Sequence, residues 1–166
     1  YRDLDPAIAP IYDARGIGRF INLEAITWGA ELETSVRITS SWRLLANALL
    51  LESENQSEKV RDRQGERLPG IYHDSVMIQS IWEIRPFSVS LSWHHDDGLF
   101  YDASNQLSAQ ARQIVNASAS WSRIWPNRHE TLITLEARNL TDNIYQDFNR
   151  LPGPGRSLFL NLKHTL

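Results

Sequence analysis

Phe87-Ser88-Val89-Ser90-Leu91-Ser92-Trp93 is the stretch of this chain that decides its fold. Apolar and hydroxyl-bearing residues alternate along it, and successive side chains of a β-strand point to opposite faces. The stretch therefore predicts a strand with one apolar and one polar face. The same division occurs over residues 115–122, and again over residues 28–39, where apolar residues alternate mainly with glutamate, serine and arginine.

Working outward, the alternation recurs in segments of about ten residues that turn or loop signals separate. The connections between segments are alternately short and long, so the long ones gather at one end of the sheet. Outer-membrane barrels have this asymmetry, with short periplasmic turns and longer extracellular loops. We expect an all-β, antiparallel transmembrane barrel wall, with residues 1–19 as loop. Its seven predicted strands lie at about residues 20–38, 43–53, 70–84, 87–97, 113–124, 131–141 and 156–166.

Alternation alone does not distinguish a lipid-facing sheet from a soluble β-sandwich or a lipocalin-like barrel. The composition of the polar faces favours the lipid-facing sheet. These faces carry Ser, Asn, Thr, Gln and Glu and very little Lys, as a barrel lumen does. Aromatic residues also lie near predicted strand ends, where amphipathic rings suit the membrane–water interface. These residues are Trp28, Trp42, Tyr72, Trp82, Trp93, Trp121 and Trp125.

Composition excludes several partners and chemistries. The 17 basic and 20 acidic residues are scattered and give a net charge of −3, so we expect no nucleic-acid partner. The absence of cysteine removes disulfides and thiolate metal sites. The longest apolar run, residues 44–51, is much shorter than the roughly 20 residues of a membrane-spanning helix. Because the chain begins with Tyr1, we expect its true start to have been removed.

The last predicted strand ends with the chain and is apolar on one face. Such a strand resembles the insertion signal of outer-membrane proteins. These signals usually end on an aromatic residue, whereas this chain ends on leucine and has histidine two positions earlier. The residues of this face are Leu158, Leu160, Leu162, His164 and Leu166.

A longer motif precedes that strand: Asn139-Leu140-Thr141-Asp142-Asn143-Ile144-Tyr145, followed by Pro152-Gly153-Pro154-Gly155-Arg156. It resembles the closing segment of TonB-dependent outer-membrane receptors. Two earlier segments are similar to the same family, namely residues 22–33 with their Gly-x-Glu-x-Glu strand and residues 68–73 with Leu-Pro before His. A simple hairpin loop would explain why the motif contains Pro and Gly residues. It would not explain why they occur between Tyr145 and Arg156 in this order.

The resemblance implies a barrel of about 22 strands with a plugged lumen. Seven strands cannot close a barrel, so we expect residues 1–166 to be a C-terminal part of such a domain, without the plug and TonB-engaging segments. The resemblance further implies active import across the bacterial outer membrane. The expected partners are outer-membrane lipid, the TonB complex through the plug, and a ferric siderophore, haem or cobalamin, with a ferric siderophore favoured.

Neither an enzyme activity nor a cofactor is expected. The run His94-His95-Asp96-Asp97 offers His94 and Asp96 on one face, which is too few ligands for a metal but leaves both as ligand-contact candidates. His73, Asp74 and Ser75 are triad residue types, but neighbours on one strand diverge. A passive porin, a barrel enzyme such as a lipase, and a soluble β-sandwich binding module remain the alternatives.

Overall fold

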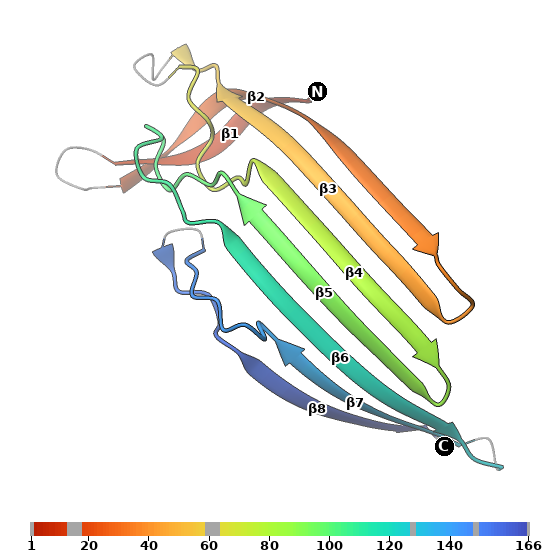
Figure 1. The fold of residues 1–166 in the computed structure, drawn as a ribbon. Coiled ribbons are helices and arrows are strands. Elements are labelled where there is room, and N and C mark those ends of the chain that lie inside the picture. The colour runs from red at the N-terminus through yellow and green to blue at the C-terminus, as the bar shows by residue number, and fades with distance from the viewer. Residues whose placement is uncertain (1, 13–17, 59–63, 127–128, 148–149, 166) are drawn as a thin grey trace.

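One continuous antiparallel sheet makes up the protein (Figure 1). The computed structural model describes residues 2–12, 18–58, 64–126, 129–147 and 150–165, and only the backbone of residues 2–12 and 18–23. The eight strands, β1 to β8, pair in chain order, each with the next. Their bounds are Arg2–Tyr12, Gly18–Arg37, Trp42–Asn55, Asp74–Ile84, Phe87–Asp97, Arg112–Ile124, Glu130–Arg138 and Ser157–Thr165. The predicted all-β antiparallel class is confirmed.

The expectation of a loop over residues 1–19 is wrong for β1, which pairs with β2. Pro6 and Pro10 conceal this strand in the sequence, because proline disrupts a strand that has neighbours on both sides. Within the described sheet β1 has a neighbour on one side alone, where proline is tolerated. The register also shifts between Leu4 and Ala7, which breaks the period of two.

Two predicted strand boundaries are also wrong, and left-handed backbone conformations explain both. The strand expected from residue 70 begins at Asp74, because Gly70 has φ of 80° in a turn. The strand expected to reach residue 141 ends at Arg138, because Asn139 has φ of 49°. Such values are incompatible with an extended strand.

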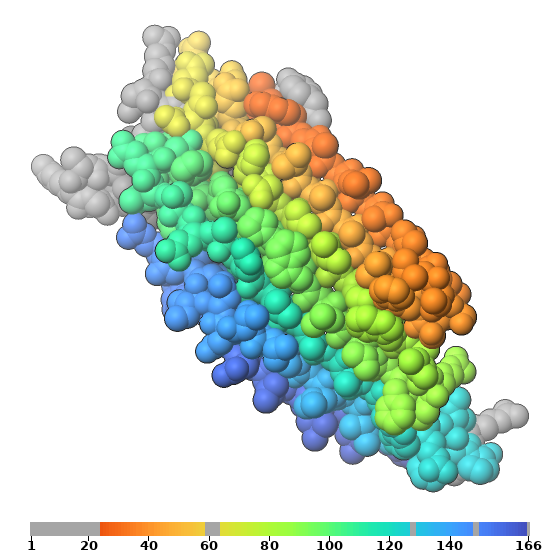
Figure 2. Space-filling view, in the orientation of Figure 1, coloured from red at the N-terminus to blue at the C-terminus, as the bar shows by residue number. Residues whose placement is uncertain are grey.

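The apolar face of the sheet is its exposed face. Along β5, Val89 and Leu91 are exposed, while Ser90 and Ser92, which alternate with them, are half-buried. Leu160 of β8 keeps 74% of its surface accessible. In the space-filling view the coloured segments follow one another as adjacent bands from orange to blue (Figure 2). The described strands form a single layer, and none of the described residues forms a second sheet over the apolar face.

The opposite face, here called the polar face, is lined by hydroxyl groups that bond across strands. The Ser90 and Ser118 hydroxyls lie 2.8 Å apart, and those of Ser120 and Thr134 lie 3.0 Å apart. These hydroxyl groups therefore satisfy one another's hydrogen bonding across neighbouring strands. This lining is typical of a barrel lumen.

Aromatic side chains mark both ends of the apolar face. Trp42 and Trp82 stack with ring centroids 6.2 Å apart at the short-turn end, and the Trp42 indole donates to the Ser80 hydroxyl at 2.8 Å. Trp28 and Trp93 occupy the other half of the sheet, towards the long loops. Among the described residues, no helix has the length and apolar character required to cross a membrane.

A charge placed on either face gives the first prediction. Leu91→Arg in the intact parent protein puts a cation on the apolar face of a strand that has neighbours on both sides, whereas Ser92→Arg puts it on the polar face. If the apolar face meets lipid, Leu91→Arg lowers the free energy of unfolding by about 2–4 kcal/mol. Reversible denaturant unfolding in lipid vesicles measures the change, and an equal effect of Ser92→Arg would contradict the assignment of the faces.

Candidate functional site at the long-loop end

Three long connections lie together at one end of the sheet (Figure 1). They join β3 to β4 (residues 56–73), β5 to β6 (residues 98–111) and β7 to β8 (residues 139–156). The turns at the other end are short. The predicted alternation of connection lengths is thus present. It gathers the polar side chains of the three long loops at one end of the sheet, here called the mouth.

The first two long loops share a small core. Leu68, Leu99 and Ala103 are three of the four buried apolar side chains of the described residues, with exposed fractions of 6%, 1% and 7%. The Gly70 N–H donates to the Phe100 carbonyl at 2.9 Å. We call residues 64–73 and 98–111 together the loop cap, because these contacts join the two segments into one folded unit.

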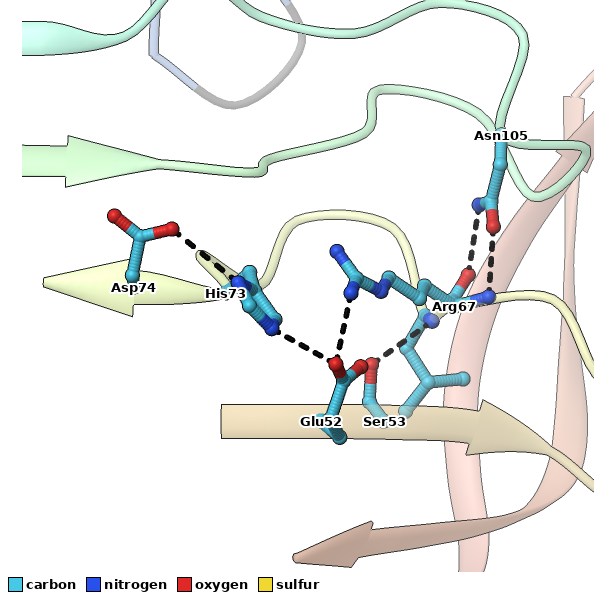
Figure 3. Close-up of polar contacts among 7 residues, drawn as sticks. Glu52, Ser53, Arg67, His73, Asp74 and Asn105 are labelled. Atoms are coloured by element: carbon cyan, nitrogen blue, oxygen red, sulfur yellow. Dashed lines mark hydrogen bonds and ion pairs between the residues drawn. The ribbon is translucent and has the colours of Figure 1, made fainter. Parts of the chain in front are cut away.

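Asn105 holds the loop cap together (Figure 3). Its side-chain oxygen accepts from the Arg67 N–H at 2.8 Å, and its Nδ2 donates to the Arg67 carbonyl at 3.0 Å. Both backbone groups of Arg67 are therefore satisfied by one amide from the other loop. Asn105 has φ of 53°, a conformation that asparagine tolerates better than most residues.

Asp102 forms the turn that presents Asn105. Its carboxylate accepts from the N–H groups of Gln106 at 3.1 Å and Leu107 at 2.8 Å, and it also bonds Ser104. Burial raises the pKa of Asp102, but these hydrogen bonds outweigh burial and leave its pKa below the ordinary value of 3.8. The carboxylate is consequently ionised, and the turn intact, at neutral pH.

Glu52 anchors the loop cap to β3 (Figure 3). Its Oε1 lies 2.9 Å from Nη2 of Arg67 and 2.8 Å from Nε2 of His73. His73 also places Nδ1 3.2 Å from Asp74, whose other oxygen is 3.5 Å from Nε2 of His95. The described residues hold no group of three or more His, Cys, Asp or Glu side chains suited to a metal ion. The contacts of Glu52 with Arg67 and His73 join the loop cap to β3.

On the polar face, Asp96 is fully engaged. It is 8% exposed, accepts from Nε and Nη2 of Arg112 at 2.9 and 2.7 Å, and accepts from the Ser75 hydroxyl at 2.6 Å. The guanidinium of Arg112 lies 5.1 Å from the ring centre of Tyr72 and 5.4 Å from that of Tyr145. Asp96 thus positions an arginine between two tyrosines.

The other ligand-contact candidate, His94, shares the polar face with Asp96 and lies opposite Met77 and Ile114. Sequence analysis missed Arg112 as a partner of Asp96. The pairing of Asp96 with Arg112 follows from the cross-strand register, because the two residues lie directly opposite one another in β5 and β6. That register is not visible in the sequence before the strands are aligned.

Asn139 organises the third long loop, here called the closing loop. It is 3% exposed, and its Nδ2 donates to the carbonyls of Asn143 at 3.0 Å and Pro154 at 3.1 Å. Its Oδ1 accepts from the Asn143 N–H at 2.9 Å, while its own N–H donates to Asn116 of β6 at 3.0 Å. One amide therefore joins both halves of the loop to the sheet.

The other motif residues complete the same structure. Asp142 accepts from the Arg156 N–H at 2.8 Å, and the Gly153 N–H donates to the Tyr145 carbonyl at 2.9 Å. A Cβ at position 153 would overlap the Tyr145 ring, so glycine is required there. The remaining motif residues are also placed: Leu140 N–H bonds Val115, Pro152 bridges to Gln146, and Gly155 lies against Asp142.

Of the predicted insertion strand, Leu158, Leu160 and Leu162 lie on the exposed apolar face of β8. Leu166 lies outside the described residues. His164 contacts the Thr131 hydroxyl at 2.9 Å through Nδ1.

Comparison with known proteins finds no matching family model and no matching curated protein. Solved structures do match. The ferric preacinetobactin receptor of Acinetobacter baumannii is 18% identical over 96% of this chain, with a TM-score of 0.78. The ferric yersiniabactin uptake receptor of Yersinia pestis is 21% identical over 86% of the chain, with a TM-score of 0.65. The chain has the fold of a receptor barrel wall.

A copper transporter, OprC, has the same fold, with 18% identity over 95% of this chain and a TM-score of 0.72. The chain spans about a quarter of the length of these proteins, namely 25%, 23% and 26%. The resemblance to outer-membrane receptors is thus confirmed at the level of the fold. The similar structures are those of receptors and transporters rather than enzymes.

Two substitutions at Asn105 separate its hydrogen bonds from its backbone conformation. Asn105→Gly removes the amide but keeps the left-handed backbone, whereas Asn105→Ala also adds strain of about 1 kcal/mol. Both should speed hydrogen–deuterium exchange in residues 64–73 and 98–111 of the intact parent, with alanine the stronger. Unchanged exchange in both variants would show that Asn105 does not join the loops.

Gly153→Ala tests the closing loop, because its new methyl group displaces the Tyr145 ring from the loop and from Arg112. We expect faster hydrogen exchange over residues 139–156, while the strands stay protected. Gly65→Ala is the control for backbone strain away from the closing loop: Gly65 has φ of 87°, so alanine strains the backbone there, but an added Cβ meets nothing within 4 Å. Equal protection of the closing loop in both variants would overturn the proposed role of Gly153.

Proposed function

We propose that this chain is the C-terminal part of the barrel of an outer-membrane receptor, which imports a scarce nutrient, with a ferric siderophore favoured, by energy supplied through TonB. The observation that carries the proposal is the sheet itself, with its exposed apolar face, hydroxyl-lined polar face and long loops at one end. In this function the strands form the wall of the import path, and the loops form its outer mouth.

The two free edges of the sheet support a larger barrel. In the described residues β1 and β8 each pair with one neighbour only. An unpaired backbone N–H or C=O costs several kcal/mol in hydrocarbon, so sheets that span membranes close. Eight strands are about a third of a 22-stranded transporter barrel. The remaining strands and a plug that contacts TonB would belong to the rest of the parent protein.

The ligand class rests on a narrower argument. Two of the similar structures are named as receptors for ferric preacinetobactin and ferric yersiniabactin, and a third as a copper transporter. The fold therefore serves more than one cargo. A ferric siderophore is the proposal because iron-chelate receptors prevail among these proteins, and an arginine–tyrosine cluster at the mouth is compatible with an anionic chelate.

Iron uptake by the source bacterium tests the function. Cells with and without the parent gene are starved of iron and given radioactive iron in spent medium that contains their own chelators. We expect uptake to fall on deletion of the parent gene, to recover on complementation, and to be abolished by a protonophore or by deletion of tonB. Cell fractionation should place the parent in the outer membrane.

The alternatives give different results in the same experiment. Uptake that persists with the protonophore would indicate a passive porin. Unchanged iron uptake after deletion of the parent gene would overturn the ferric siderophore as ligand. Recovery of the parent in a soluble fraction would contradict the whole proposal.

A further inference from the structure

The loop cap and the closing loop are separate folded units. The cap is held by its own core and by Asn105, whereas the closing loop is held by Asn139 and by packing of Tyr145 against Gly153. Each unit has part-buried hydrogen bonds of its own. A boundary between two such units is a common place for a ligand site.

Among the described residues, the contacts of Tyr101 with the closing loop are long or exposed to solvent. The Tyr101 hydroxyl donates to the Gln146 carbonyl at 3.3 Å in an exposed position. The Arg150 guanidinium lies 5.8 Å from the Tyr101 ring centre, and Nη1 of Arg112, the first residue of β6 after the cap, is 3.9 Å from Asp147. A ligand could replace these contacts at little cost, because each is long or exposed to solvent.

A cleft of about 390 Å³ opens along this boundary, within the range of small-molecule sites. Tyr101 and Gln110 line it from the cap side, and Ile144, Tyr145, Gln146 and Arg150 line it from the closing loop. We propose that this cleft binds a small ligand that carries a carboxylate or similar oxyanion next to a ring. The inference rests on the proposed function in placing the cleft outside the cell.

Charge and hydrogen bonding define the oxyanion end of the site. Arg150 is the one charged side chain among the described residues that line the cleft. Arg112 adds a second positive charge behind the Tyr145 ring, although it is shared with Asp96 and Asp147. Burial raises the pKa of the Tyr101 phenol above its ordinary value of 10.0, so the phenol remains a hydrogen-bond donor at physiological pH.

Ring faces and an apolar side chain define the other end. Ile144 is 91% exposed, although isoleucine is usually among the buried residues. It lies next to Tyr145, whose ring packs on Gly153 and is therefore held in place. The Arg150 backbone has φ of 61° and is fixed by a 2.9 Å bond from its N–H to the Asp147 carbonyl. The cleft thus pairs an oriented cation with an unfilled apolar contact.

Fluorine NMR on the purified parent protein in detergent tests the site with a matched pair of probes. The probes are para-fluorobenzoate and para-fluorobenzamide, which share a ring and differ in charge. We expect saturable binding of the benzoate, and binding of the benzamide that is weaker by about tenfold, because a hydrogen bond to a charged group contributes about 1.5–3 kcal/mol. Equal binding of the two probes, or no saturable binding of the benzoate, would overturn the proposal.

Two variants locate the binding. Arg150→Gln should weaken benzoate binding by about tenfold. Arg123→Gln should leave it unchanged, because that guanidinium lies 4.2 Å from the Trp125 ring at the opposite end of the sheet. Should Arg150→Gln fail to fold, Tyr101→Phe keeps the ring and removes the donor, and should still weaken binding. Benzoate binding that is equal in the unaltered protein and in the folded cleft variant would place the site elsewhere.

The binding assay requires neither TonB nor a membrane potential, so it can fail independently of the proposed function. Energised iron import without benzoate binding would refute the ligand site proposed for the cleft and support the proposed import function. The opposite result is also informative. If Arg150→Gln weakens benzoate binding but no energised import is found, the proposed import function is refuted and the ligand site is supported.

Discussion

Backbone hydrogen bonding is the constraint on which the rest of this structure depends. In hydrocarbon no water can satisfy an N–H or C=O group, so every strand must pair along its length. The simplest solution for a single chain is to pair each strand with the next, and this is the order found from β1 to β8. In the proposed membrane location, side chains then alternate between lipid and lumen, which accounts for the exposed apolar face.

The usual location of a protein core is inverted here. The strands form one layer, and of the buried apolar side chains in the described part of the chain, Leu68, Leu99 and Ala103 lie in the loops above the strands. The loops therefore keep their shape through local contacts, with Asn105 and Asn139 each satisfying backbone groups on two segments. The ion pair between Glu52 of β3 and Arg67 joins the loop cap to the wall, and the ion pair between Asp96 and Arg112 joins β5 to β6 beneath the loops. A rigid wall and preformed loops together make a mouth with defined chemistry.

Period-two alternation was enough to predict the sheet, because burial on one face alone imposes that period. It failed at β1, where Pro6 and Pro10 interrupt the pattern, and at residues 70–73 and 139–141, where left-handed residues end the strand. The contacts of the site were less accessible. Arg67 meets Asn105, and Asp96 meets Arg112, across gaps of 38 and 16 residues, which only the strand register and loop packing bring together. The closing motif was identified by resemblance, and its physical basis became clear only from the hydrogen bonds of Asn139 and the packing of Tyr145.

Everything proposed for this chain requires that its apolar face meet lipid. The measurement that addresses this is electron paramagnetic resonance of nitroxide labels, placed one at a time through cysteine substitutions at residues 88–92 of the intact parent in lipid vesicles. Molecular oxygen concentrates in hydrocarbon and relaxes labels that face it. The account predicts strong oxygen relaxation at Val89 and Leu91 and weak relaxation at Ser88, Ser90 and Ser92. Equal relaxation along the strand, or the opposite alternation, would contradict a lipid-facing apolar surface.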